Sequence, residues 1–393
     1  MKTWDVIIVG GGVIGASAAF ELAAEKLRVA IVDRQQPGRE ASWAAGGMLS
    51  PAPHAPQDIP LVPFAKESLG LYPEFVRAVE EASGKSAGFK RAGTLEIFFT
   101  PQGEAERDKM TAEHRALELA AESISLEDAR KLEDSFSPTA RAAAWLPDEG
   151  TVEPRMLMDA LLEGARQRGV EICADCPATA LLYENGRCKG IVAGGETMAA
   201  GHVVVAAGAY SAHLGMADEI GGETRIHPEG FARYAPTRPV RGQIVALKAP
   251  AGIHLGRVLR SARGYLVPQH DGRILAGSTL EEAGFQNRVT DTGVKKTLNG
   301  AHDMMPALKE AEIVETWAGL RPGTPDDLPI IGPTEIEGLV AATGHYRNGI
   351  LLAPATARLV REWITHGQAE RYGQKEKFSP LRFSRPRATA GGF

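Results

Sequence analysis

The sequence is short of cysteine, of aromatic residues and of net charge. Its 393 residues include 3 cysteines and 6% aromatic residues, and 44 basic residues against 49 acidic ones give a formal net charge of −5. So few cysteines, in an odd number, predict a reducing compartment, and the mild acidity offers no basic field for nucleic acid or anionic lipid. No stretch reaches the roughly 18 uninterrupted apolar residues of a membrane-spanning helix. We therefore expect a cytoplasmic globular protein that binds neither nucleic acid nor membrane.

Two of the cysteines, Cys173 and Cys176, form a CxxC motif, and the third is Cys188. A structural zinc site needs four ligands, and the sequence has no second CxxC or HxxxH to complete the set. A lone CxxC is weak evidence for a redox centre, and buried or strand-end thiols are the simpler interpretation. We predict no metal site and no chemical role for these thiols.

A glycine-rich turn near the N-terminus follows a strand and opens a helix. The apolar run Val6–Val9 leads directly into the GxGxxG pattern of Gly10–Gly15, and a helical pattern follows. The first glycine permits a tight turn, the second lets backbone N–H groups approach a pyrophosphate, and the third allows close packing of helix on strand. Asp33 ends the next strand, where it can accept hydrogen bonds from ribose hydroxyls. This unit predicts a Rossmann-like dinucleotide site, but it does not separate NAD from FAD, which share the ADP half.

Periodicity predicts further elements along the chain. Helical patterns occupy residues 64–83, 101–121, 153–168 and 349–365, and strand patterns occupy residues 170–173, 202–208 and 338–343. Apolar and polar residues alternate between about residues 240 and 280, which is typical of an antiparallel sheet. We expect a surface loop at 216–236 and a solvated, patternless tail at 367–393.

Several longer segments carry a family resemblance: Ala41-Ser42 with Ala44–Leu49, Trp317–Pro325, Gly344–Thr356, and the shorter Pro239–Gln243, Gly264–Pro268 and Gly277–Glu281. Together they resemble the D-amino-acid oxidase superfamily of FAD-dependent oxidoreductases, and within it the glycine oxidases of thiamine biosynthesis. The similarity covers about residues 4–366. It implies a two-domain α/β protein: a discontinuous FAD-binding domain (residues 1–90, 148–222 and 318–366) and a substrate domain with a mixed, mostly antiparallel sheet (residues 91–147 and 223–317).

The resemblance also implies where a noncovalent FAD binds, because residues that attach the flavin in sarcosine-oxidising relatives are missing here. The residues that it places at the cofactor are Gly10, Gly12, Val13, Ile14, Gly15, Asp33, Arg34, Ser42, Ala45, Gly46, Gly47, Met48, Ala178, Ala207, Gly208, Arg321, His345, Arg347, Asn348, Gly349, Ile350 and Leu351.

The same resemblance implies a substrate site. Arg321 corresponds to the arginine that clamps the substrate carboxylate, and a planar guanidinium suits that bidentate pairing. Tyr265 adds a hydroxyl hydrogen bond. Further residues placed at the substrate are Met48, Arg263, Arg347 and His345. Arg263 and His54 depart from the family pattern, and a structural role for His345 is as plausible as a catalytic one.

The motifs and the resemblance together favour an FAD-dependent oxidase of glycine or another small amine. In such enzymes a hydride moves from the substrate α-carbon to flavin N5, and O2 reoxidises the flavin with formation of H2O2. Two alternatives stay open: an amino-acid dehydrogenase that uses a quinone or another acceptor, and a non-catalytic or partner-dependent flavin-binding subunit. The expected partners are the amine substrate and O2, and the family implies a homo-oligomer.

Overall fold

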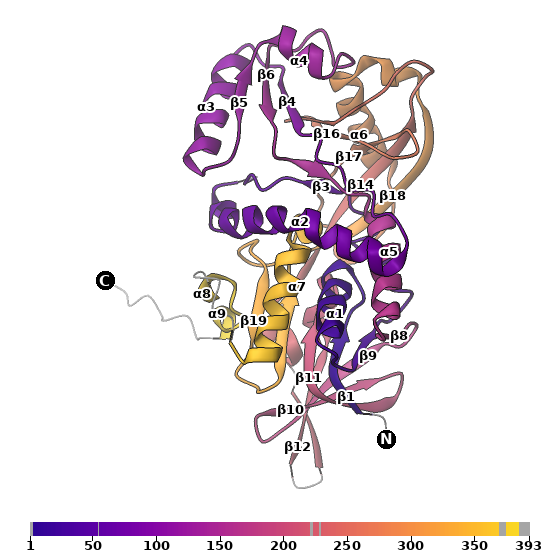
Figure 1. Cartoon of the computed structure of the whole chain (residues 1–393), viewed down its shortest axis with the longest axis vertical. Helices are drawn as coiled ribbons and strands as arrows, with labels where there is room; N and C mark the ends of the chain where they lie inside the picture. Colours follow the sequence, from indigo (N-terminus) through magenta and orange to yellow (C-terminus); the bar gives the residue numbers. More distant parts are fainter. Residues whose placement is uncertain (1–2, 54, 221–222, 228, 369–374, 385–393) are drawn as a thin grey trace, which may run out of the picture.

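The computed structural model describes the whole chain except residues 1–2, 54, 221–222, 228, 369–374 and 385–393. Two large sheets occupy opposite ends of an elongated molecule, and helix α2 crosses between them (Figure 1). A two-stranded sheet of β3 (Met48–Leu49) and β7 (Gly150–Thr151) forms a third, small unit.

The ten-stranded sheet at the lower end of Figure 1 has a parallel centre. Strand β1 pairs in parallel with β2 and β11, β2 with β8, and β11 with β20. Antiparallel strands β10, β9 and β13 extend one edge, and β19 lies antiparallel to β20. The bounds are β1 Thr3–Val9, β2 Val29–Val32, β8 Glu171–Cys173, β9 Ala178–Glu184, β10 Arg187–Ala193, β11 Glu196–Val205, β12 Gly215–Ile220, β13 Glu223–His227, β19 Ile330–Pro333 and β20 Leu339–Thr343.

The eight-stranded sheet at the upper end is antiparallel apart from the β15/β4 pair. Its order is β18-β14-β17-β16-β15-β4-β6-β5, so β18 is an edge strand. The bounds are β4 Thr94–Phe98, β5 Glu122–Ile124, β6 Ala142–Leu146, β14 Arg238–Lys248, β15 Val258–Ser261, β16 Gly264–Pro268, β17 Arg273–Gly277 and β18 Glu312–Gly323. The two sheets confirm the predicted α/β class with a mixed, mostly antiparallel second sheet.

Helices cover both sheets. Helix α1 packs against α5 and α7, and α2 packs against α5 and α7 in turn, whereas α6 lies on the eight-stranded sheet. The bounds are α1 Val13–Ala24, α2 Val62–Ser83, α3 Gly103–Ala116, α4 Leu126–Leu132, α5 Pro154–Gln167, α6 Asp291–Met304, α7 Gly349–His366, α8 Lys375–Phe378 and α9 Leu381–Ser384, with 3-10 turns η1 Pro56–Leu61, η2 Gly208–His213, η3 Gly230–Arg233 and η4 Pro306–Glu310. None of the helices in the described ranges is long and apolar enough to cross a membrane.

Strand β1 is apolar from Val6 to Val9 because this part of it is buried on both faces. Val6 and Ile8 pack into the core formed with α1, α5 and α7, whereas Ile7 and Val9 point into a second core on the other face of the sheet. This burial fixes the end of β1, and with it the glycine-rich turn that follows.

The predicted surface loop at 216–236 is wrong for its first half. Strands β12 and β13 form an antiparallel hairpin, and β12 joins the ten-stranded sheet beside β9. The sequence holds a hairpin signal, because Gly221-Gly222 separates two runs with strand character; these two glycines and residue 228 lie outside the described residues. Phe231 of the second half is fully buried.

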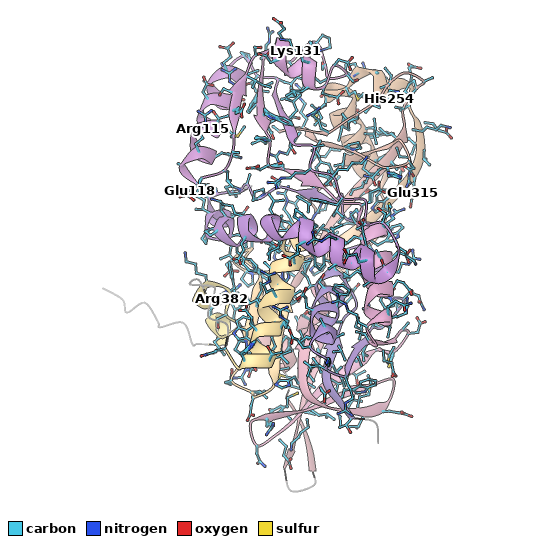
Figure 2. All side chains as sticks on the ribbon, in the orientation of Figure 1. Arg115, Glu118, Lys131, His254, Glu315 and Arg382 are labelled. Atoms are coloured by element: carbon cyan, nitrogen blue, oxygen red, sulfur yellow. The ribbon has the colours of Figure 1, made fainter. Side chains whose placement is uncertain are left out.

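The predicted patternless tail is wrong for residues 375–384, which form α8 and α9. Phe378 is buried, and its ring centroid lies 5.5 Å from that of Phe64. Arg382, labelled in Figure 2, donates hydrogen bonds of 2.8 and 3.0 Å to the Asp326 carboxylate. Apolar burial and this ion pair hold the segment on the body of the protein.

Two predicted domain boundaries, after residues 222 and 317, do not coincide with the division of the strands between the two sheets. Strand β13 was predicted in the substrate domain, but it belongs to the ten-stranded sheet, and residues 318–323 were predicted in the FAD domain, but they pair with β14 in the eight-stranded sheet. The division into domains stays a prediction.

Candidate active site

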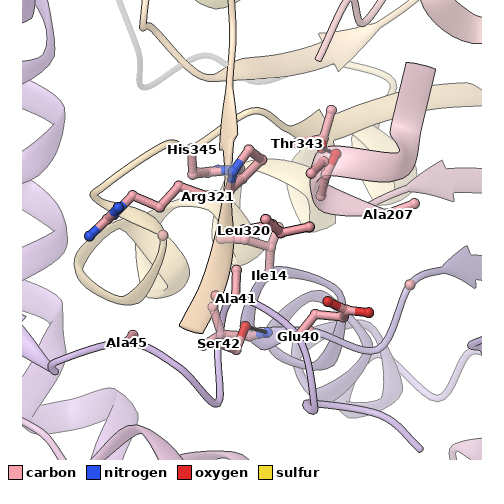
Figure 3. Close-up of a pocket in the computed structure, with 18 of the residues that line it drawn as sticks. Ile14, Glu40, Ala41, Ser42, Ala45, Ala207, Leu320, Arg321, Thr343 and His345 are labelled. Atoms are coloured by element: carbon pink, nitrogen blue, oxygen red, sulfur yellow. Dashed lines mark hydrogen bonds between the residues drawn. The ribbon is translucent and has the colours of Figure 1, made fainter. Parts of the chain in front are cut away.

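A cavity of about 390 Å³ is lined by residues from both sheets. One side consists of the turn after β1, the end of β2 and the segment 40–48, and the other of β14, β16, β18 and the residues that lead into α7. Figure 3 shows Leu320 and Arg321 on one strand, close to the segment that carries Ala41, Ser42 and Ala45.

The turn Gly10–Gly15 fits a ligand that approaches the backbone closely. Gly10 has a φ of +103°, and a Cβ there would lie 2.5 Å from the Ala206 carbonyl oxygen. A Cβ on Gly15 would lie only 1.9 Å from the Gly10 carbonyl oxygen. Helix α1 begins here with no side-chain cap at Gly12. Its Val13 N–H donates a hydrogen bond of 2.9 Å to the Ser42 hydroxyl, and the partial positive charge of this helix N-terminus favours a phosphate.

Asp33 stands at the end of β2 beside this turn. Its carboxylate accepts a hydrogen bond of 2.7 Å from the Gly11 N–H and one of 3.1 Å from the Gln35 N–H. Burial raises the pKa of Asp33, and the two backbone hydrogen bonds oppose that shift. The carboxylate therefore braces the glycine turn, and its remaining lone pairs can accept from a ribose hydroxyl.

A second helix N-terminus faces the cavity. Helix α7 begins at Gly349, with no side-chain cap at Asn348, and both Gly349 and Ile350 line the cavity. Its partial positive charge favours a ligand that carries or gains negative charge at this end. The N-termini of α1 and α7 thus both contribute to the lining of the cavity, which suits a ligand with two electron-rich regions.

His345 lies just before α7, and it is 2% exposed. Its Nε2 lies 3.0 Å from the Thr356 hydroxyl, and burial lowers the pKa of His345 to about 3. The imidazole is therefore neutral at ordinary pH and bonded to α7, so the structural interpretation is the better one.

Arg321 presents a half-buried guanidinium to the cavity. Its Nη1 donates 3.2 Å to the Thr279 carbonyl and its Nη2 donates 2.8 Å to the Ser278 hydroxyl. In the described part of the chain no carboxylate forms an ion pair with it. Burial lowers the pKa of Arg321, yet a guanidinium stays protonated at neutral pH. Such a charge is costly unless an anion joins it.

Tyr265 and Met48 line the cavity and belong to one apolar cluster. The Tyr265 ring lies in a slot between two glycines. A Cβ on Gly277 would lie 2.4 Å from the Tyr265 hydroxyl, and one on Gly46 would lie 3.2 Å from it. A glycine at 277 is therefore needed to admit the ring, whereas a Cβ at position 46 would require the ring to move by a few tenths of an ångström.

The structure brings most predicted site residues together. The cavity-lining ones are Gly10, Gly12, Val13, Ile14, Asp33, Arg34, Ser42, Ala45, Gly46, Gly47, Met48, Ala178, Ala207, Gly208, Tyr265, Arg321, His345, Arg347, Gly349 and Ile350. Gly15, Asn348 and Leu351 are not lining residues but flank them in α1 and α7. His54 lies outside the described residues.

The structure does not bring Arg263, which was predicted at the substrate, to the cavity. Its Nη1 lies 2.6 Å from Asp303 Oδ2, its guanidinium lies over the Phe99 ring, and it is not among the lining residues. Arg263 is two residues from Tyr265 in sequence, but it stands in the turn between β15 and β16, outside the cavity.

Sequence reasoning missed several lining residues. Gly242 and Ser278 fall in the quoted motifs Pro239–Gln243 and Gly277–Glu281, so the signal was present, but their role needs the contact with Arg321. Further missed residues are Glu40, Tyr210, His213, Ile244, Gly319, Leu320, Pro322 and Tyr346.

None of the three cysteines forms a disulfide, and none lines the cavity. Burial raises the pKa of Cys188 to about 11. Across the described ranges, no group of three or more His, Cys, Asp or Glu side chains could hold a metal ion.

Comparison with known proteins agrees with this geometry. The family model described as FAD dependent oxidoreductase matches residues 5–363. The bifunctional protein ThiO/ThiG of Synechocystis is 33% identical over 390 residues, which are 97% of this chain and 54% of that protein, so the chain spans about half the length of this curated relative.

Two other relatives match over nearly their whole length. The glycine oxidase of Geobacillus kaustophilus is 34% identical over 375 residues (92% of this chain, 93% of that protein). The crystal structure of glycine oxidase from this organism has a TM-score of 0.87 at 31% identity and covers 97% of this chain and 99% of that one. Hydrogen cyanide synthase subunit HcnC of Pseudomonas aeruginosa is 32% identical over 410 residues (92% of this chain, 93% of that protein).

Proposed function

Because the chain belongs to the FAD-dependent oxidoreductase family, we propose that it oxidises glycine or a similarly small primary or secondary amine. The amine and O2 give an imine and H2O2, and the imine then hydrolyses. The relatives named as ThiO/ThiG and glycine oxidase support this reaction, and they support a place in the biosynthesis of the thiamine thiazole.

The observation that carries the proposal is the half-buried Arg321 guanidinium, whose hydrogen-bond partners in the described part of the chain are neutral. Thr279 and Ser278 hold two of its N–H groups, and the nearby Glu281 is committed to Arg241 and Gln243. A small carboxylate that enters the cavity would complete the charge pairing, so an amino acid binds here in preference to a simple amine.

The residues of the chain then bind the substrate and orient its α-carbon. Arg321 fixes the carboxylate, the Tyr265 hydroxyl donates a second hydrogen bond to it, and Met48 limits the space for a side chain. FAD, when bound, supplies the two-electron acceptor. Because the neutral His345 is bonded to Thr356, we assign no proton transfer to it; fixing the α-carbon by two contacts supplies orientation.

Anaerobic mixing of the FAD-loaded protein with a panel of amines tests the function. Bleaching of the flavin absorbance with glycine, followed by recovery and H2O2 formation in air, is the expected result. If glycine and the other small amino acids leave the flavin oxidised, the proposal is wrong.

A second candidate is a dehydrogenase or flavin subunit that passes electrons to an acceptor other than O2. The similarity to HcnC, named as a subunit of a synthase, favours it. Bleaching with glycine but no recovery in air, together with turnover on addition of a quinone or dye, would identify this function.

We further propose noncovalent FAD, a homo-oligomeric assembly and a cytoplasmic location. Acid precipitation tests the first of these, because noncovalent flavin leaves a colourless pellet and a yellow supernatant. Light scattering on the purified protein tests the second.

A further inference from the structure

A buried charged cluster lies behind the wall of the cavity. Arg260 of β15 has a side chain that is 15% exposed, and its Nε forms a short hydrogen bond with Glu96. Its Nη1 donates 2.9 Å to the Ser50 hydroxyl and lies 3.3 Å from Glu149 Oε2. Ser50 in turn donates to Glu149 Oε1. One guanidinium thus joins three segments that are distant in sequence.

The cluster is connected to Tyr265 through the sheet. Arg260 and Tyr265 are directly opposite each other in the antiparallel β15/β16 pair. Opposite residues of such a pair project from the same face and lie close together. The Arg260 side chain and the cavity-lining Tyr265 ring are therefore neighbours on one face of the sheet.

The cluster is also connected to the other wall of the Tyr265 slot. Ser50 lies at the end of the segment that contains Gly46 and Met48, and Gly46 closes the slot over the Tyr265 hydroxyl. Strand β3 of this segment pairs with β7, which directly follows Glu149. The Arg260, Ser50 and Glu149 contacts thus set the distance between the segment 46–50 and the strand pair that carries Tyr265.

We propose that Arg260 is a positioning residue: through Ser50 and Glu149 it clamps the segment 46–50 over the Tyr265 ring and so fixes the hydroxyl that contacts the substrate carboxylate. This inference rests on the proposed function. Arg260 acts through Tyr265 and does not touch the substrate.

Loss of a purely structural ion pair would lower stability without changing substrate binding. The test therefore compares the effect of each substitution on stability with its effect on substrate binding. Ser50→Ala removes the bridging hydroxyl, and Arg260→Lys keeps the charge but loses the planar fork. The matched control is Arg361→Lys, because Arg361 pairs with Glu21 at 2.7 Å between α7 and α1, with side chains 27% and 23% exposed. The measurements are the Kd of acetate from flavin difference spectra, KM and kcat for glycine, flavin content and Tm.

We expect Ser50→Ala and Arg260→Lys to raise the acetate Kd and the glycine KM by about two- to tenfold, the worth of one displaced hydrogen bond, with little change in kcat. Arg361→Lys should lower Tm and leave Kd and KM unchanged. In a Tyr265→Phe background, the effect of Ser50→Ala on Kd should disappear, since a residue that acts through the hydroxyl has nothing left to position.

Two outcomes would overturn the inference: unchanged Kd and KM in Ser50→Ala with full flavin content, or an effect of the same size in the Tyr265→Phe background. Ser50→Ala keeps the test decisive if Arg260→Lys does not fold, because it leaves all three charges in place. Failure of the proposed function is distinct, since the parent itself would then neither oxidise glycine nor change its flavin spectrum with acetate.

Discussion

Gly242 has no side chain, and the Arg321 guanidinium occupies the space that a side chain there would fill. Gly242 lies in β14, opposite Gly319 in the neighbouring β18, and a Cβ at this position would lie 2.2 Å from Arg321 Nη1 and 2.4 Å from its Cζ. Those distances are far below van der Waals contact, so in Gly242→Ala the guanidinium must move. Because it is the end of a flexible side chain, the strands can keep their positions while the charge leaves its site.

The expected loss in kcat/KM follows from the hydrogen bond to the substrate carboxylate that the displaced guanidinium no longer makes. A hydrogen bond between charged groups contributes about 1.5–3 kcal/mol, so kcat/KM for glycine should fall by about ten- to 150-fold in Gly242→Ala. An amine without a carboxylate should lose much less. Steady-state H2O2 formation with glycine and with a simple primary amine measures the difference.

Gly70→Ala is the matched control, because no atom lies within 4 Å of a Cβ at Gly70 in helix α2. It should keep parental kinetics and gain about 0.5–1 kcal/mol in stability. If Gly242→Ala retains the parental kcat/KM for glycine with full flavin content, Arg321 does not hold the carboxylate from this position.

Further substitutions test other parts of the site. Arg321→Lys should not rescue Arg321→Ala, because an ammonium lacks the two-pronged geometry; equal kcat/KM for the lysine variant and the parent would contradict this. Gly15→Ala should give colourless protein, since the new Cβ would overlap a backbone oxygen at 1.9 Å, and an unchanged ratio of flavin to protein absorbance would refute it. Because the pKa of His345 is about 3 in the fold and about 6.5 when unfolded, the unfolded chain binds an extra proton between these values. Stability should therefore decrease below pH 6.5, by at most about 1.4 kcal/mol per pH unit; a His345→Gln variant should show a shallower decrease in Tm, and identical slopes would argue against a buried neutral imidazole. Replacing both Cys173 and Cys176 with Ser should leave turnover within about threefold of the parent, and complete loss with FAD bound would reopen a redox role.

The parts of the site that the sequence predicts well are those in which local backbone and chemistry coincide. The turn Gly10–Gly15 needs glycine for reasons visible in a few residues, and its strand and helix neighbours have clear periods. The helix at α7 and the strand β20 were predicted for the same reason. Asp33 follows because the ends of neighbouring parallel strands meet at one edge of the sheet.

The parts that the sequence does not predict depend on contacts between distant segments. Arg263 and Tyr265 are close in sequence, yet a tight turn sends one side chain to Asp303 and the other into the cavity. Position 242 requires a glycine because of the guanidinium of Arg321, a residue 79 positions later in the sequence. The segment 375–384 has no period of its own. It is ordered by contacts with distant parts of the chain, made by Phe378, Leu381, Arg382 and Phe383.

The order in which the chain visits the two sheets has a consequence for how the molecule can be divided. It passes from the ten-stranded sheet to the eight-stranded one and back, four crossings in all, before α7 completes the cavity. A cut in any one of these crossings therefore leaves two fragments that each contribute strands or helices to the cavity, so a chain nicked there by a protease should stay associated and keep its flavin. For the same reason no contiguous piece of the gene encodes the site, and recombination with a relative at one crossover point exchanges part of both sheets at once.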